Sequence, residues 1–147
     1  MKYILLAVLI ISAVSCKVAY IPSESVSARQ ESGYEMSVNV SVLASTDKEA
    51  NLLCMTKVFE NIFFIGTPNT INNLPMLEGA KSEYSSFFDS FITKGQYASF
   101  VTSNSDIDNI VVKKTPRTIR YNKRITVNVQ SLKLYLTREG VVRKFGY

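Results

Sequence analysis

The sequence predicts an α+β domain, a mainly antiparallel sheet with two or three helices packed on one face. Three observations favour this class. Residues 36–42 alternate between apolar and polar side chains, the period of a strand buried on one face. Residues 52–63 and 84–92 repeat apolar side chains at helical spacing. Several short strand-like segments and a last helical segment follow, so most strands are separate from the helices in sequence.

Composition agrees with a folded domain and narrows the chemistry. Of the 147 residues 46% are hydrophobic, and eight Tyr and eight Phe can fill a core. The chain has no His, which excludes Ser-His-Asp and Cys-His nucleophile systems, and its two Cys supply no zinc site. The six Gly are too scattered for a phosphate-binding loop. We therefore expect no catalytic residue, no metal and no cofactor.

Residues 1–15 have the pattern of a secretory signal peptide. Lys2 precedes an apolar run over residues 4–11, and small residues then lead to Cys16. The run is too short for a transmembrane helix, which needs about 20 residues. We expect cleavage and lipidation at Cys16, although Ala13 stands where a lipobox more often has Leu. The mature chain would then be anchored in a bacterial cell envelope, at the outer membrane.

A second fate of Cys16 remains open. Lipidation with acyl chains such as palmitate contributes about 0.8 kcal/mol per buried methylene, which makes the anchor effectively permanent. If ordinary signal peptidase cuts after Ser15 instead, Cys16 is free to pair with Cys54 in an oxidising compartment. Residues 16–33, rich in Ser, are expected to be a tether, with a short edge strand near residues 18–21 as the alternative. Residues 34–147 form the single predicted domain.

The first predicted unit is a strand followed by a helix over residues 36–65. Thr46 with Glu49 three positions later is a capping box, which marks the start of the helix. Gly66 and Pro68 match the usual end of a helix. Cys54 lies inside this helix next to its apolar stripe, and we expect it to be a buried thiol.

A loop and an aromatic helix follow. Asn, Pro and Gly over residues 67–80 predict a long loop. Residues 80–93 predict a helix whose aromatic face is the expected plug of the core; this face comprises Tyr84, Phe87, Phe88, Phe91 and Ile92.

The remaining segments predict strands and a final helix. We expect a strand at 96–102, a polar turn at 103–109, a strand from 110 that is interrupted at Pro116, and a helix at 131–139. Residues 118–121 and 124–129 predict a hairpin that turns at Asn122-Lys123. On this hairpin Arg120 and Arg124 point away from the apolar side chains, which predicts a sheet with one wet, basic face.

Charge is unevenly distributed along the chain. Residues 17–112 hold six Lys or Arg against eleven Asp or Glu, whereas residues 113–147 hold ten against one. The expected binding residues are Arg117, Arg120, Lys123 and Arg124. A solvated face that aids solubility is the competing interpretation. Because a secreted protein rarely meets nucleic acid, an acidic protein, a lipid head group or a glycan is the expected partner.

Two pairs of carboxylates provide the enzymatic alternative. A glycosidase needs only two carboxyl groups, and Glu78 with Glu83 or Asp106 with Asp108 are the candidates. Glu78 and Glu83 also flank a helix start, where negative charge is favoured for structural reasons. Residues 106–109 offer oxygen ligands for Ca²⁺ but lack the Gly and the distal Glu of an EF-hand loop, so we expect a solvated turn.

The chain resembles small uncharacterised lipoproteins of Bacteroides-type bacteria. The resemblance rests on the leader that ends at Cys16, the strand and helix over residues 36–65, and the C-terminal sequence. The latter is Ile125-Thr-Val-Asn-Val, then Leu132, Leu136 and Gly140-Val-Val-Arg-Lys-Phe-Gly-Tyr. It implies a lipid-anchored envelope protein and assigns no activity to any residue. Lys-Val-Ala follows Cys16 in place of the acidic run associated with surface export, so a periplasmic and an external orientation both stay open.

These observations lead to three functional hypotheses. The first is a non-enzymatic, membrane-anchored envelope lipoprotein that acts as a binding or assembly module. The second is a hydrolase of envelope glycans that uses carboxylates. The third is a structural lipoprotein that self-associates through an open sheet edge.

Overall fold

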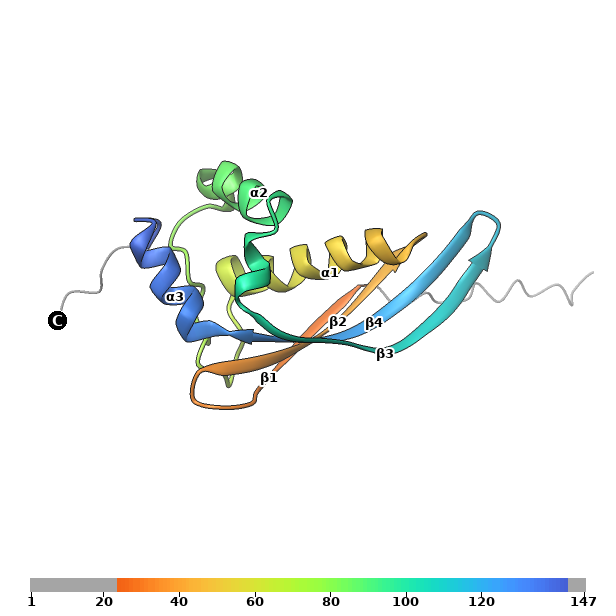
Figure 1. Cartoon of the computed structure of the whole chain (residues 1–147), viewed down its shortest axis with the longest axis horizontal. Coiled ribbons are helices and arrows are strands. Elements are labelled where there is room, and N and C mark those ends of the chain that lie inside the picture. Colours follow the sequence, from red (N-terminus) through yellow and green to blue (C-terminus); the bar gives the residue numbers. More distant parts are fainter. Residues whose placement is uncertain (1–23, 143–147) are drawn as a thin grey trace, which may run out of the picture.

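The computed structural model describes residues 24–142, and it confirms the α+β prediction (Figure 1). Four antiparallel strands form one sheet in the order β1-β2-β4-β3, and the helices lie on one of its faces. The predicted signal peptide and Cys16 lie outside the described residues. In chain order the elements are β1 Ser25–Gln30, β2 Glu35–Ala44, α1 Asp47–Glu60, the π-helical turn η2 Asn61–Ile65, the 3₁₀ turn η3 Lys81–Tyr84, α2 Ser85–Thr93, the 3₁₀ turn η4 Gln96–Ser99, β3 Val101–Lys114, β4 Arg117–Asn128 and α3 Val129–Arg138.

The sheet begins inside the segment that was predicted to be a tether. β1 pairs antiparallel with β2, with Val26 opposite Val40 and Ala28 opposite Val38. The tether prediction for residues 16–33 is therefore wrong over Ser25–Gln30. The Ser residues of β1 lie on the solvent side of the strand, where they do not oppose pairing. The alternative strand near residues 18–21 lies outside the described residues.

The first predicted unit is confirmed, including its start and its end. β2 buries alternate residues, and the Thr46 hydroxyl accepts a hydrogen bond from the Glu49 amide at 3.2 Å. At the other end of α1 the helix widens into η2 and stops at Gly66, whose φ of +81° favours glycine. A Cβ at Gly66 would lie 2.8 Å from the backbone carbon of Leu74, so the loop that follows packs directly on this position.

The core lies between the sheet and the helices, and aromatic rings fill one end of it. Phe91 of α2 is fully buried, and its ring centroid lies 5.1 Å from that of Phe59 and 5.3 Å from that of Phe63. Phe100 and Tyr135 continue this cluster toward α3, with centroids 5.1 Å apart. Edge-to-face and offset contacts of this kind contribute beyond the burial of area. The prediction that the aromatic helix plugs the core is confirmed.

β3 and β4 correct the predicted C-terminal hairpin. β4 runs unbroken through Asn122-Lys123, because both residues pair with β2 on one side and β3 on the other. The chain turns at Thr115-Pro116 instead, and the predicted polar turn at residues 103–109 belongs to β3. β3 is an edge strand exposed along most of its length, so polar side chains are tolerated throughout. Figure 1 shows this hairpin extending past the start of α1.

Of two further predicted segments, the strand from residue 96 starts later than expected, and the final helix is confirmed. The strand predicted from residue 96 begins only at Val101, because residues 96–99 form the 3₁₀ turn η4. The final helix is confirmed as α3, and the Asn128 side chain caps it by accepting from the Ser131 amide at 2.9 Å.

Candidate functional site

The structure does not bring the four predicted binding cations together. Arg120 and Arg124 lie on the face of the sheet opposite the helices, and Arg124 Nε donates to Asn39 Oδ1 at 3.1 Å. Lys123 points the other way and is only 7% exposed. Arg117 is exposed near the turn of the β3–β4 hairpin, opposite Lys114. Including Lys123 in an exposed basic patch was therefore wrong, because β4 does not turn at residue 122 and successive side chains alternate between its faces.

Lys123 belongs to a polar cluster under α1. Its Nζ lies 2.6 Å from Asp106 Oδ1, and the Asp106 side chain remains 56% exposed. Asp106 comes from the edge strand β3, which is exposed along most of its length. A buried ammonium needs such a partner, since desolvation of an isolated charge is costly. We interpret Lys123 and Asp106 as a structural pair.

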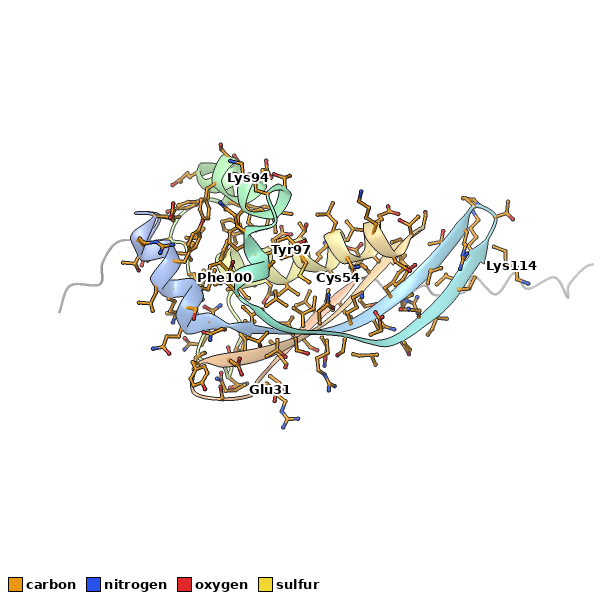
Figure 2. All side chains as sticks on the ribbon, viewed as in Figure 1. Glu31, Cys54, Lys94, Tyr97, Phe100 and Lys114 are labelled. Carbon is orange, nitrogen blue, oxygen red and sulfur yellow. The ribbon has the colours of Figure 1, made fainter. Side chains whose placement is uncertain are left out.

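Cys54 lies on the side of α1 that faces the sheet, and its side chain is fully buried (Figure 2). Burial raises the pKa of the Cys54 thiol from 9.0 to about 11, against a smaller lowering by Lys123. The thiol is thus protonated at neutral pH and is a poor nucleophile. Cys54 is a free, buried cysteine here, and its alternative pairing with Cys16 lies outside the described residues.

The predicted carboxylate pair Asp106 and Asp108 is not brought together. Asp106 pairs with Lys123 and Asp108 with Asn122, which are consecutive residues of β4. The two carboxylates therefore lie on opposite faces of the sheet and cannot flank one glycosidic bond or chelate one Ca²⁺. Glu83 Oε1 accepts a hydrogen bond from the Ala80 amide at 3.3 Å, a capping role at the start of η3. Across residues 24–142 no group of three or more His, Cys, Asp or Glu could hold a metal ion.

The candidate site is the open face of the sheet, defined as the face of β1–β4 that no described helix covers. Its polar side chains meet across strands, as in the 2.8 Å hydrogen bond between the Ser37 and Thr126 hydroxyls. Ser25, Ser27 and Asn39 line a shallow groove of about 220 Å³ on this face. The residues of the open face are Ser25, Ser27, Arg29, Glu35, Ser37, Asn39, Ser41, Leu43, Ser103, Ser105, Asp108, Ile110, Lys113, Thr118, Arg120, Asn122, Arg124, Thr126 and Asn128.

The open face carries four cations, Arg29, Lys113, Arg120 and Arg124, against the carboxylates Glu35 and Asp108, so its charge is weakly positive. Arg29 and Arg124 are exposed, and Arg120 is half-buried. Guanidinium groups bind carboxylates, phosphates and sulfates in a planar, two-pronged geometry, so this surface suits an anionic ligand. Arg29 was not among the predicted binding residues, although the alternation of Ser25, Ser27 and Arg29 with Val26 and Ala28 is a signal that identifies it.

Comparison with known proteins identifies no relative of this chain. No protein-family model, no curated protein and no solved structure matches the chain. No helix within residues 24–142 combines the length and the apolar character needed to cross a bilayer.

Proposed function

We propose that this chain is a non-enzymatic, membrane-anchored envelope lipoprotein whose open face binds an anionic partner. The anchor is supported by the sequence alone, through the charged and apolar leader that ends at Cys16. The binding role is supported by one observation, the uncovered sheet face that carries Arg29, Arg120 and Arg124. The partner is a protein, lipid head group or glycan that presents carboxylate, phosphate or sulfate groups.

The geometry favours a binding surface over a merely solvated one for two reasons. First, Asn39 orients the Arg124 guanidinium by accepting from its Nε, which leaves its two terminal nitrogens free for a bidentate contact. Second, most of the side chains around Arg124 are hydroxyls and amides with little conformational freedom, as at Ser37, Asn39 and Ser105, so ordering them on binding costs less than ordering lysines or glutamates.

The binding role is tested by removing two charges from the open face. We expect the double variant Arg120→Ser, Arg124→Ser to lose most of its binding to vesicles of anionic phospholipid and to acidic polysaccharide at low salt. The control variant Lys48→Ser, Lys94→Ser makes the same change in charge on exposed cations of the helical layer. Binding that depends only on net charge would fall equally in both variants, and that result would contradict the proposal.

The anchor is tested by the mass of the native protein. Extraction from the membrane should give a chain that begins at Cys16 and carries the added mass of its acyl chains. The variant Cys16→Ser should be released from the membrane fraction. An intact-mass spectrum of a chain that still begins at Met1 would contradict the anchor without bearing on the open face.

The long β3 edge favours self-association as a second candidate function. Ile107, Ile110 and Val111 of β3 are each about half exposed, at 51%, 46% and 53%. Three register shifts interrupt the strand, and such bulges usually hinder edge-to-edge pairing. Sedimentation of the full chain across a range of concentrations decides this candidate, since a chain that stays monomeric has no such role.

A further inference from the structure

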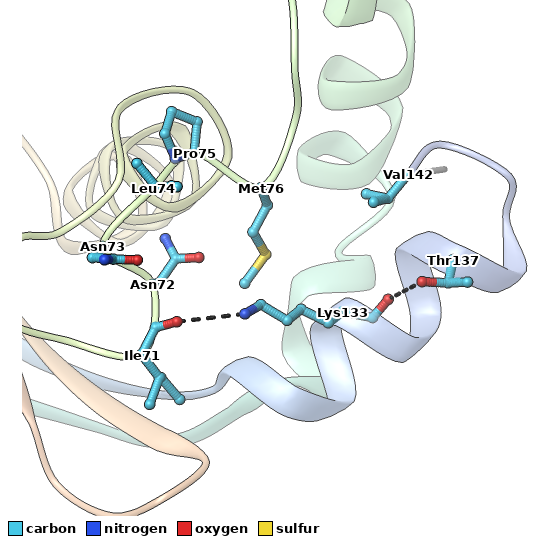
Figure 3. A pocket seen from close by; sticks show the side chains of 9 residues that line it. All are labelled: Ile71, Asn72, Asn73, Leu74, Pro75, Met76, Lys133, Thr137 and Val142. Atoms are coloured by element: carbon cyan, nitrogen blue, oxygen red, sulfur yellow. Dashed lines mark hydrogen bonds between the residues drawn. The ribbon is translucent and has the colours of Figure 1, made fainter. Parts of the chain in front are cut away.

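A second candidate site lies in a cleft between the loop over residues 71–76 and α3, formed by none of the open-face residues (Figure 3). Its deepest polar group is Asn72, which is 2% exposed. Asn72 Nδ2 donates to the Ile62 carbonyl at 3.0 Å, and its backbone carbonyl accepts from the Thr67 amide at 2.6 Å. Asn72 Oδ1 is buried and has no hydrogen-bond partner.

An unpartnered oxygen at this place calls for an explanation. Most buried polar atoms in native proteins are satisfied, and an unsatisfied one costs about 1–3 kcal/mol. The loop cannot relieve the cost by turning the side chain over, because Nδ2 is needed by the Ile62 carbonyl. A hydrogen-bond donor supplied by a ligand in the cleft removes the cost.

The other walls of the cleft are mostly apolar. Leu74, Pro75, Met76 and Val142 line a volume of about 220 Å³. Leu74 is 70% exposed, so an apolar wall stands open to solvent. A cavity of about 150 Å³ accommodates benzene, and this volume therefore suits one amino-acid residue. The Met76 thioether lies between Asn72 and Lys133 in Figure 3. Its three rotatable bonds allow it to move aside and uncover the oxygen.

Lys133 of α3 supplies a cation at the mouth of the cleft. Its Nζ lies 3.4 Å from the Ile71 carbonyl, a long contact that uses one of its three protons. Of the four salt bridges formed among residues 24–142, none includes Lys133. The ammonium is thus available to an anionic group in the same cleft as Asn72, next to the Ile71 carbonyl.

We propose that this cleft binds the free carboxyl end of a polypeptide whose last residue is apolar. The terminal carboxylate pairs with Lys133 Nζ, the amide N–H of the last residue donates to Asn72 Oδ1, and its side chain packs against Leu74 and Val142. A fatty acid offers the anion and the apolar chain but no N–H, and an amidated peptide offers no anion. The terminal residue of a polypeptide has all three groups within the span of one residue.

The test is a binding titration of the full chain with short labelled peptides that end in leucine. Fluorescence anisotropy should show saturable binding of the free acid and binding at least ten-fold weaker for the carboxamide. The variant Lys133→Gln should bind the free-acid peptide only as weakly as the carboxamide peptide, and its binding of the carboxamide should be unchanged. The matched control Lys94→Gln, an exposed lysine at the end of α2, should bind both peptides as the unmodified chain does.

The contact with Asn72 is tested on the ligand, because a substitution at Asn72 would also break its bond to Ile62. N-methylation of the last amide removes the N–H and should weaken binding of the free-acid peptide at least ten-fold. Equal binding of acid and carboxamide, no effect of N-methylation, or octanoate that competes as strongly as the peptide would each overturn the proposal. Absence of saturation at millimolar peptide would do so as well. The outcome is independent of the open face, since the variant Arg120→Ser, Arg124→Ser keeps the cleft intact.

Discussion

Removing Asp106 and removing Lys123 from their buried ion pair should have different effects on the stability of the fold. Lys123 Nζ lies 2.6 Å from Asp106 Oδ1, with the Lys side chain 9% and the Asp side chain 56% exposed. Asp106→Ala leaves a buried ammonium without its partner. Lys123→Met removes the buried charge, keeps most of the apolar stem, and leaves Asp106 free to be hydrated.

The magnitude follows from this asymmetry. At 2.6 Å the Coulomb attraction is about 6 kcal/mol for an effective dielectric constant near 20 and about 1.6 kcal/mol in bulk water. The exposed Asp106 places the pair toward the lower value. We expect Asp106→Ala to lower the free energy of unfolding by about 1–3 kcal/mol. We expect Lys123→Met to change it by less than about 1 kcal/mol, because relief of desolvation offsets the lost attraction.

The assay is urea unfolding followed by circular dichroism at neutral pH, for both single variants and the double variant. On the Lys123→Met background Asp106→Ala should have almost no effect, so the two changes are strongly non-additive. Asp108→Ala is the matched control. It removes a neighbouring carboxylate on the other face of the sheet, and its effect should stay within about 0.5 kcal/mol. The reasoning is refuted if Asp106→Ala costs the same with and without Lys123, or no more than the control.

Three other predictions concern stability. Stability should fall by about 2 kcal/mol between pH 9 and 11, because the pKa of Cys54 is 9.0 when exposed and about 11 when buried, so the unfolded state loses the proton first. Cys54→Ala should lack this part of the alkaline loss in chemical unfolding, and an identical slope would contradict the assignment. Gly66→Ala should cost about 2–4 kcal/mol, since its Cβ would meet the backbone of the loop at 2.8 Å, whereas Gly95→Ala, with φ of +67° and no neighbour within 4 Å, should cost only about 1 kcal/mol by thermal unfolding. Thr46→Ala should cost about 1 kcal/mol through loss of the cap on α1, and an unchanged melting temperature would show that the Glu49 amide finds another acceptor.

Local patterns identified the elements whose formation depends on near neighbours. Short stretches of sequence predicted four such features, and the structure confirms them. They are the alternation of β2, the cap at Thr46, the end of the helix at Gly66 and the aromatic face of α2. In each case one side of the element is buried, so the period of apolar residues reports its geometry directly.

The errors lie where the surroundings decide the conformation. Asn122-Lys123 has the composition of a turn, but β2 and β3 pair with it from both sides and hold it extended. The polar run of residues 103–109 forms a strand because β4 supplies its hydrogen bonds and solvent accepts its side chains. Pairing partners that lie far away in sequence override local propensity in both places.

The two candidate sites show the same division. The sequence by itself determined an antiparallel sheet with helices on one face and the core-facing residues of β2 and α2, while the leader that ends at Cys16 stays a prediction. The alternation also placed Arg120 and Arg124 on the solvent face, whereas only the tertiary structure decided that Lys123 faces the core and that the loop after η2 meets α3 around Asn72. The physical reason is that periodicity assigns each residue to a face, whereas strand register and long-range packing decide what that face meets.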